Sequence, residues 1–425
     1  MKGFIRRIRE YLPTEDLRRL VAARGLRSLV QGYILVIFAI YLAQIGFSPW
    51  LIGLTLGIGS AVSALLTLAT GIVSDRYGRK PFLLAYSVLL ALSGIIFSIT
   101  AIPLVLIAVS ALGGLGRGGG VGGQAGPFAP AEVALLSEKT TLANRSAVFS
   151  INSAVGMLTM ALGTVFAGLP EMIRSAYGLP LAVSYDPLFL GVAAVGVVTF
   201  FLLWPIKETV DRSAARGRPH EKKTMSRKEN IRMIGKISIA GMVNGFGIGF
   251  VGGILPYLLY LRFNVSPGVI GPVIGGSSVL ASFSSLWMAR LARRFGDINI
   301  ITISRIFGVA CTALIPIVPG FALAAVFVVL RMAGAMGAMP IRQSYTMGIV
   351  DDDLRGTVAG ISGVARRLPS AVSPAISGIW INMGELELPF FASAAFMAAN
   401  AALYFHWFRR VKPREAGLVE EGERG

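Results

Sequence analysis

The sequence predicts an all-α integral membrane protein with twelve transmembrane helices in two six-helix bundles. Its 425 residues are 54% hydrophobic and only 15% charged, and the mean hydropathy is +0.69, which a soluble domain does not show. About twelve apolar runs reach the roughly 20 residues that a spanning helix needs. The two halves of the chain also repeat one another, which predicts two bundles of the same topology.

The basic residues are distributed unevenly between the loops. About 32 of the 40 Lys and Arg residues fall in one set of alternating loops and tails, and only Arg174 and Arg262 fall in the other. The positive-inside rule therefore predicts that both termini are cytoplasmic. We expect a multi-pass protein of the plasma (cell inner) membrane. The same placement accounts for the net charge of +18, so nucleic acid is not an expected partner.

The first half begins with a cytoplasmic segment, residues 1–27, whose first residues suit an interfacial helix or a frayed basic tail equally well. The N-terminal six-helix bundle is expected over residues 28–206. Each of its helices is an apolar run bounded by turn or charged residues, at about 28–47, 49–74, 81–101, 103–136, 143–168 and 187–206.

The composition then shifts to a basic, poorly apolar stretch. Residues 207–233 are expected to be a cytoplasmic linker, which anionic lipid would attract. The C-terminal bundle is expected over 234–408, and residues 409–425 form a charged cytoplasmic tail. The helices of this bundle are predicted at about 234–261, 267–289, 298–318, 321–348, 355–382 and 388–408.

The repeat between the halves has a constant offset of 218 residues. The first-half motif consists of a Ser-Pro pair, an Ile-Gly pair, a glycine and a serine, and each member recurs in the second half. The matching positions are Ser48-Pro49 with Ser266-Pro267, Ile52-Gly53 with Ile270-Gly271, Gly57 with Gly275, and Ser60 with Ser278.

A charged hinge separates the second and third predicted helices. Gly78 can end the first of them in a left-handed conformation, and Pro81 suits the first turn of the next. Asp75 lies at the C-terminus of its helix, where the macrodipole disfavours an anion, so it should have a partner elsewhere. The residues that make up this hinge motif are Gly71, Asp75, Arg76, Gly78, Arg79 and Lys80.

This hinge closely resembles the signature loop of the major facilitator superfamily, which lies between the second and third transmembrane helices. The resemblance implies a transporter whose loop latches the two halves in one state of alternating access, with a substrate site between the bundles. Asp75 would then contact the helix N-terminus near 354–356 in the outward-open state. The second-half hinge departs from the pattern, with Arg293 at the position of Asp75, so a latch there should be weaker.

Arginines within the predicted helices are the main candidates for substrate binding, because an intramembrane cation needs a partner or a polar cavity. Arg117 and Arg331 match in the two halves, and the alternative is that each is tied to helix carbonyls. Arg366 and Arg367 point about 100° apart on their helix, so one can serve the cavity while the other is structural. Two further arginines, Arg305 and Arg342, are expected to snorkel as structural residues. Polar residues that could orient a substrate are Gln31, Asn244 and Tyr257.

Glu132 is the clear intramembrane acid of the sequence. It is a candidate for proton coupling, because transporters use buried carboxylates for this purpose. The alternative, which the sequence favours, is an ion pair with Arg79. The single cysteine, Cys311, excludes an intramolecular disulfide and a cysteine-based metal motif, and no cofactor is expected.

The sequence therefore predicts a secondary active transporter of a small organic solute, with an anionic substrate favoured by the many arginines and few acids. Proton coupling is left open, and efflux of lipophilic drugs is the alternative. A polytopic membrane enzyme is a remote alternative, because the sequence holds no H-E-x-x-H motif, nucleophile elbow or carboxylate pair. The expected partners are a small-molecule substrate and membrane lipids, with protons as a further candidate, and the chain is expected to act as a monomer.

Overall fold

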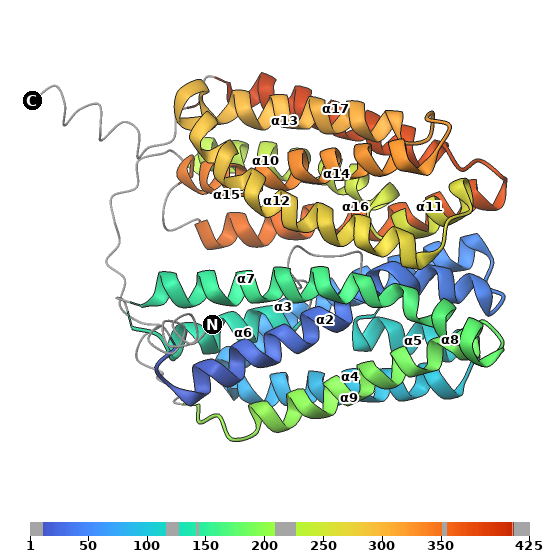
Figure 1. Cartoon of the computed structure of the whole chain (residues 1–425). Coiled ribbons are helices and arrows are strands. Elements are labelled where there is room, and N and C mark those ends of the chain that lie inside the picture. The colour runs from blue at the N-terminus through green and yellow to red at the C-terminus, as the bar shows by residue number, and fades with distance from the viewer. Residues whose placement is uncertain are drawn as a thin grey trace, which may run out of the picture. The chain divides into compact units, whose positions relative to one another are not determined.

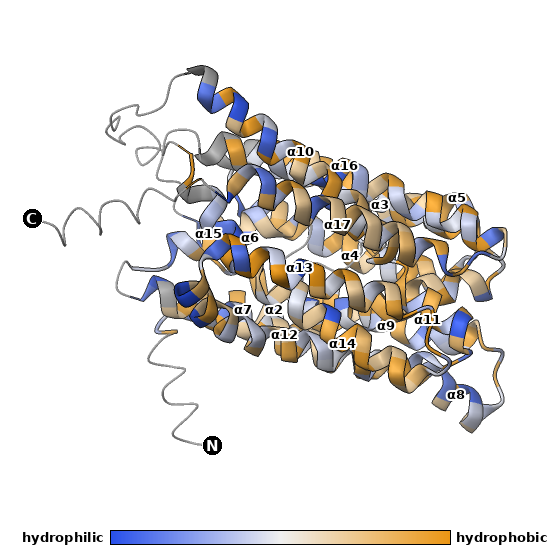
Figure 2. Ribbon diagram, turned by 90° about the horizontal axis from the view of Figure 1, so that it is seen from above, coloured by the Kyte–Doolittle hydropathy of each residue, from blue (hydrophilic) through white to orange (hydrophobic). Residues whose placement is uncertain are grey.

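The computed structural model describes residues 12–115, 127–141, 144–208, 227–350, 355–409 and 411. Within these ranges every regular element is a helix, as Figure 1 shows. Ten of these helices are long and apolar enough to cross a membrane by length and composition. Figure 2 shows hydrophobic residues along the helical stretches and hydrophilic residues gathered toward their ends. The described residues thus have the character of a multi-pass membrane protein.

The helices fall into two compact units. Unit 1 comprises residues 1–211 and 253–275, and unit 2 comprises residues 212–252 and 276–425. The division does not follow the chain order, since a short stretch of the second half packs within unit 1.

Unit 1 begins with a long helix, α2, that starts well before the predicted residue 28. The Thr14 hydroxyl oxygen caps it by accepting from Leu17 N at 3.3 Å, which is a favoured way to begin a helix. The first-half elements are α2 (Glu15–Gln44), α3 (Pro49–Tyr77), α4 (Lys80–Ile99), α5 (Pro103–Gly113), α6 (Phe128–Glu138), α7 (Arg145–Val165), η2 (Phe166–Gly168), α8 (Leu169–Tyr177), η3 (Val183–Tyr185) and α9 (Asp186–Leu203).

Glycines allow two pairs of helices in unit 1 to cross at backbone contact. A Cβ atom on Gly32 of α2 would collide with the Met160 carbonyl oxygen of α7, and one on Gly163 would collide with the Leu29 carbonyl oxygen. Gly94 of α4 and Gly196 of α9 make the equivalent approach between those two helices. Such small-residue crossings are the usual means of close helix packing in membranes.

The second half begins with a broken helix, where the sequence predicted one continuous element over 234–261. Gly252 and Gly253 interrupt it, and the second piece, α11, packs in unit 1 against α2, where Gln44 Nε2 donates to the Tyr260 hydroxyl at 3.0 Å. The elements are α10 (Arg227–Val251), α11 (Leu255–Phe263), α12 (Pro267–Phe295), α13 (Asp297–Leu314), α14 (Phe321–Gly337), α15 (Met339–Gly348), α16 (Arg355–Asn382) and α17 (Leu388–Phe408).

Unit 2 is built around a close crossing of α10 and α16. A Cβ atom on Gly245 would collide with the Arg366 carbonyl oxygen, and one on Gly249 would lie 2.8 Å from Ser370 Cα. Asn400 of α17 ties this pair to its neighbour by donating from Nδ2 to the Ala240 carbonyl oxygen at 2.6 Å. These contacts fix the polar residues of α10 and α16 relative to α17.

Candidate functional site

The charged hinge of unit 1 is held by a carboxylate that sequence analysis did not single out. Helix α3 ends at Tyr77, and Gly78 follows with φ +94°. The Glu208 carboxylate, just beyond α9, accepts from Arg79 N and from Lys80 N, the latter at 3.0 Å. An anion at the start of α4 is favourable because the positive end of the helix dipole lies there. A Cβ on Gly78 would lie 2.9 Å from Glu208 Oε2, so glycine allows this approach.

The Arg79 side chain contacts the end of α6 rather than Glu132. Its Nη1 lies 3.3 Å from Glu138 Oε2 and 3.4 Å from the Ala134 carbonyl oxygen. The expected Arg79–Glu132 pair is therefore wrong, because Glu132 lies more than a turn before Glu138 on α6 and has other partners.

In the described part of the chain, Arg76 and Gly71 of the hinge form no ion pair or hydrogen bond with another helix like those of Arg79 and Lys80. Arg76 is exposed beside the ring of its neighbour Tyr77, and a Cβ on Gly71 would meet nothing within 4 Å. The Asp75 side chain and residues 351–354 lie outside the described parts of the structure, so the expected latch contact stays a prediction.

Glu132 lies in a buried ionic cluster that links α2, α6 and α7. It forms an ion pair with Arg27, Arg24 Nη1 lies 3.9 Å from its Oε1, and Asn152 Nδ2 donates to the same oxygen at 3.3 Å. Arg24, Arg27 and Glu132 are each 4% exposed or less. Two cations share one carboxylate, so these three residues together carry a net positive charge inside unit 1.

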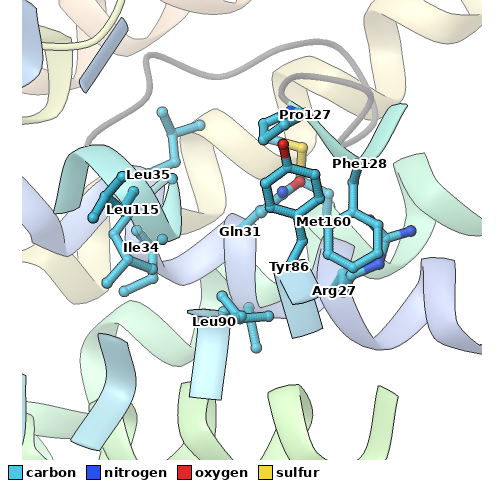
Figure 3. A pocket seen from close by; sticks show the side chains of 14 residues that line it. Arg27, Gln31, Ile34, Leu35, Tyr86, Leu90, Leu115, Pro127, Phe128 and Met160 are labelled. Carbon is cyan, nitrogen blue, oxygen red and sulfur yellow. The ribbon is translucent and has the colours of Figure 1, made fainter. Parts of the chain in front are cut away.

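Arg27 of this cluster also lines a pocket of unit 1, which Figure 3 shows. The Arg27 guanidinium stacks over the Phe128 ring at 3.8 Å, and the Tyr86 and Phe128 ring centroids are 5.8 Å apart. Gln31, a predicted substrate contact, is among the lining residues. The wall on the far side is aliphatic, with Ile34 and Leu115 among its residues. An aromatic and apolar pocket with a few polar groups is the usual form of a small-molecule site.

Arg331 is the most deeply buried of the described arginines that the sequence predicts to bind substrate. It lies on α14 of unit 2, is 6% exposed, and its Nε has no hydrogen-bond partner. No carboxylate in the described part of the chain forms an ion pair with it. Its predicted counterpart Arg117 falls between Leu115 and Pro127, outside the described residues.

Asn244 is buried in unit 2 and has a partner that the sequence did not suggest. Its Oδ1 accepts from Arg305 Nη1 at 3.2 Å, while its Nδ2 is buried without a hydrogen-bond partner. The Arg305 guanidinium also lies 5.1 Å from the centroid of the Tyr404 ring. Arg305 is thus half-buried and engaged within the unit instead of snorkelling to a helix end.

The structure brings some predicted site residues together and separates others. Arg366 and Arg367 are both half-buried on α16, and the Arg366 backbone lies against Gly245, next to Asn244. Tyr257, in contrast, is buried on α11 within unit 1. The sequence did not indicate roles for Arg24, Arg27 and Glu208. Each lies at the edge of an apolar run, where a charged residue usually marks only the end of a membrane helix.

Comparisons with known proteins agree with this architecture. A family model described as Major Facilitator Superfamily matches residues 20–374 and 237–424. The chain is 21% identical over 412 residues to the uncharacterized membrane protein YJR124C of Saccharomyces cerevisiae, with 90% of this chain and 91% of that protein covered. It is 19% identical over 375 residues to the quinolone resistance protein NorA of Staphylococcus aureus, with 88% and 91% covered.

Among solved structures, the nucleoside transporter NupG is similar with a TM-score of 0.71 at 13% identity. The match covers 94% of this chain and 100% of NupG. At this identity the likeness is one of fold.

Proposed function

This chain belongs to the Major Facilitator Superfamily, and from that premise we propose that it is a secondary active transporter whose substrate is a small organic anion. The family and the fold are those of transporters. The choice of an anion depends on charge balance inside the membrane-spanning helices of unit 2.

The burial of Arg331 is the observation that carries this choice. A cation in the middle of a membrane helix costs several kcal/mol unless a partner or a polar cavity compensates it. Arg331 is 6% exposed and has no ion-pair partner among the described residues. A substrate carboxylate or phosphate would supply the missing negative charge. The energetic cost of burying Arg331 would then be lower when the substrate is bound than when the site is empty.

We assign the supporting roles as follows. Arg331 and Arg117 are the proposed anion contacts, in line with their equivalent positions in the repeat. One of Arg366 and Arg367 supports them, and we assign this role to Arg367 because the Arg366 backbone packs against Gly245, next to Asn244. Gln31 in the unit 1 pocket contributes to orientation of the apolar part of the substrate.

Uptake into proteoliposomes, combined with thermal shifts in detergent, tests this proposal. The panel contains carboxylates, phosphate esters and neutral lipophilic compounds. We expect anions to stabilise the wild type, and Arg331→Lys to bind them about tenfold more weakly although the charge is kept, because the two-pronged guanidinium contact is lost. The matched control is Arg294→Lys, since Arg294 is an exposed arginine of the same unit.

Two results would contradict the proposal of an anionic substrate. The first is that only neutral compounds stabilise the protein and are taken up. The other is Arg331→Lys with a lowered midpoint in the absence of ligand and undiminished anion binding, which would mean that Arg331 only braces helix packing.

Export of lipophilic drugs is the second candidate function. The aromatic and aliphatic pocket of unit 1 favours it (Figure 3), and so does the similarity to a protein named for quinolone resistance. Under this candidate, neutral or cationic aromatic compounds would stabilise the wild type, and Phe128→Ala would remove the effect while Arg331→Lys would not.

A further inference from the structure

We propose that unit 2 contains a phosphate-binding site, separate from the substrate contacts above, in which Arg305, Arg342 and Arg366 surround one anion. Asn244 and Tyr404 complete its wall. These five residues come from α13, α15, α16, α10 and α17, all of which lie in unit 2.

The centre of this site is the contact among Asn244, Arg305 and Tyr404. Arg305 Nη1 donates to Asn244 Oδ1 at 3.2 Å, and the guanidinium carbon lies 5.1 Å from the Tyr404 ring centroid. The ring restricts the guanidinium from one side, and the Asn244 amide orients it. A charged side chain is thus held in place within the bundle.

Arg342 and Arg366 lie within electrostatic range of this contact. Arg342 interacts electrostatically with both Arg305 and Arg366, and Arg305 and Arg366 each interact with Tyr404. The position of Arg366 is fixed by the glycine crossing, because its carbonyl oxygen packs directly on Gly245, the residue after Asn244. Three helices therefore present three cations to one region of unit 2.

Among the described residues, the arginines of this site have no paired carboxylate, and Asn244 has a hydrogen-bond donor without an acceptor. None of the three arginines forms an ion pair with a carboxylate in the described ranges. Asn244 is 5% exposed, and its Nδ2 is a buried donor without a hydrogen-bond partner. Neighbouring like charges that are only partly exposed to water repel one another and lose hydration. A bound anion removes both penalties, so the arrangement favours a ligand.

The number of donors favours a phosphate group over a carboxylate. One arginine can satisfy a carboxylate through two parallel hydrogen bonds, whereas three arginines and an amide suit a group with three or four oxygens and about two negative charges at neutral pH. The phosphate group can come from a soluble phosphate compound or from a lipid headgroup. Tyr404 lies one turn before the end of α17 at Phe408, so this wall of the site lies toward one end of that helix.

Thermal unfolding of the full-length protein in detergent tests the site with inorganic phosphate as the probe, against chloride at equal ionic strength. We expect phosphate to raise the midpoint of the wild type and of the control Arg294→Gln, which removes an exposed charge of the same unit. Arg342→Gln should unfold no earlier than the wild type in chloride, because it relieves repulsion. Its apparent affinity for phosphate should fall about tenfold or more. Arg342→Lys keeps the charge and should lose less.

Reconstitution in nanodiscs distinguishes the two sources. If discs containing phosphatidic acid raise the midpoint relative to phosphatidylcholine, and Arg342→Gln removes that gain, the ligand is a lipid headgroup. If inorganic phosphate acts equally in both discs, the ligand is soluble. The proposal is overturned if neither probe stabilises the wild type, or if Arg342→Gln lowers the midpoint in chloride and leaves the phosphate response unchanged. These outcomes do not depend on Arg331, so they leave the substrate proposal independently testable.

Discussion

Glu132 of α6 and Arg27 of α2 form a buried ion pair that joins these two helices. Glu132 was recognisable as a buried acid from its position in an apolar run, but its partners were not. Arg27 is 105 positions away in the sequence, and nothing local indicates that the two meet. Glu208 lies just past an apolar run and looks like an ordinary solvated charge, although it binds the start of α4.

Glu132 is the residue for which we expect the largest loss of stability. Glu132→Gln removes the carboxylate that pairs with the buried Arg27 and lies beside Arg24, and breaking such a pair costs about 3–5 kcal/mol. The control Glu138→Gln removes the ion-pair partner of Arg79 in a less buried pair and should cost about 1 kcal/mol or less. Thermal or denaturant unfolding in detergent measures both.

Addition of Arg27→Gln to Glu132→Gln should restore part of the loss, since it removes a buried cation whose ion pair has been broken. A double variant less stable than Glu132→Gln would contradict the structural role. Gradient-driven transport provides the second readout. If Glu132→Gln folds and abolishes only pH-driven uptake, while exchange of substrate for substrate persists, Glu132 carries protons instead.

At the scale of elements, prolines and glycines made the prediction of helix ends possible. Pro49, Pro103 and Pro267 each lie at the start of a helix in the structure, because proline fits the first turn. The break between α10 and α11 was missed, since Gly252 and Gly253 lie in an otherwise unbroken apolar run. Hydropathy indicates which residues lie in the membrane, but it does not indicate whether the helix that they form is continuous.

The crossing of α2 and α7 gives a prediction at the same scale. Gly163→Ala places a methyl group against the Leu29 backbone, and because backbone cannot move as a side chain can, we expect a loss of about 1–3 kcal/mol. The control is Gly276→Ala in α12, where the added Cβ meets nothing within 4 Å and helix propensity favours alanine. Equal midpoints for the two variants in a thermal melt would show that α2 and α7 do not pack as described.

For the whole molecule, the alternation of charge between loops predicts the orientation in the membrane. Cysteine introduced at Gly217, in the linker, should resist an impermeant reagent added to intact cells, whereas cysteine at Asn382, exposed at the end of α16, should react. Native Cys311 is 3% exposed and should give little background. Labelling of the linker site alone would reverse the assigned orientation.

The sequence repeat and the compact units of the structure describe different properties of the chain. The offset of 218 residues reports which segments are equivalent, not which surfaces they bury. Residues 253–275 belong to the second repeat by sequence, and yet they pack within unit 1. Their placement depends on contacts such as the one between Gln44 and Tyr260, and neither residue stands out from other polar groups in apolar helices.

The membership of residues 253–275 in unit 1 has a consequence for biosynthesis. A ribosome makes the chain from its N-terminus, so unit 1 cannot acquire its full set of contacts until the codons for these residues have been read. By then α10, which belongs to unit 2, has already been synthesised. Until residues 253–275 are made, Gln44 of α2 therefore lacks its hydrogen-bond partner Tyr260.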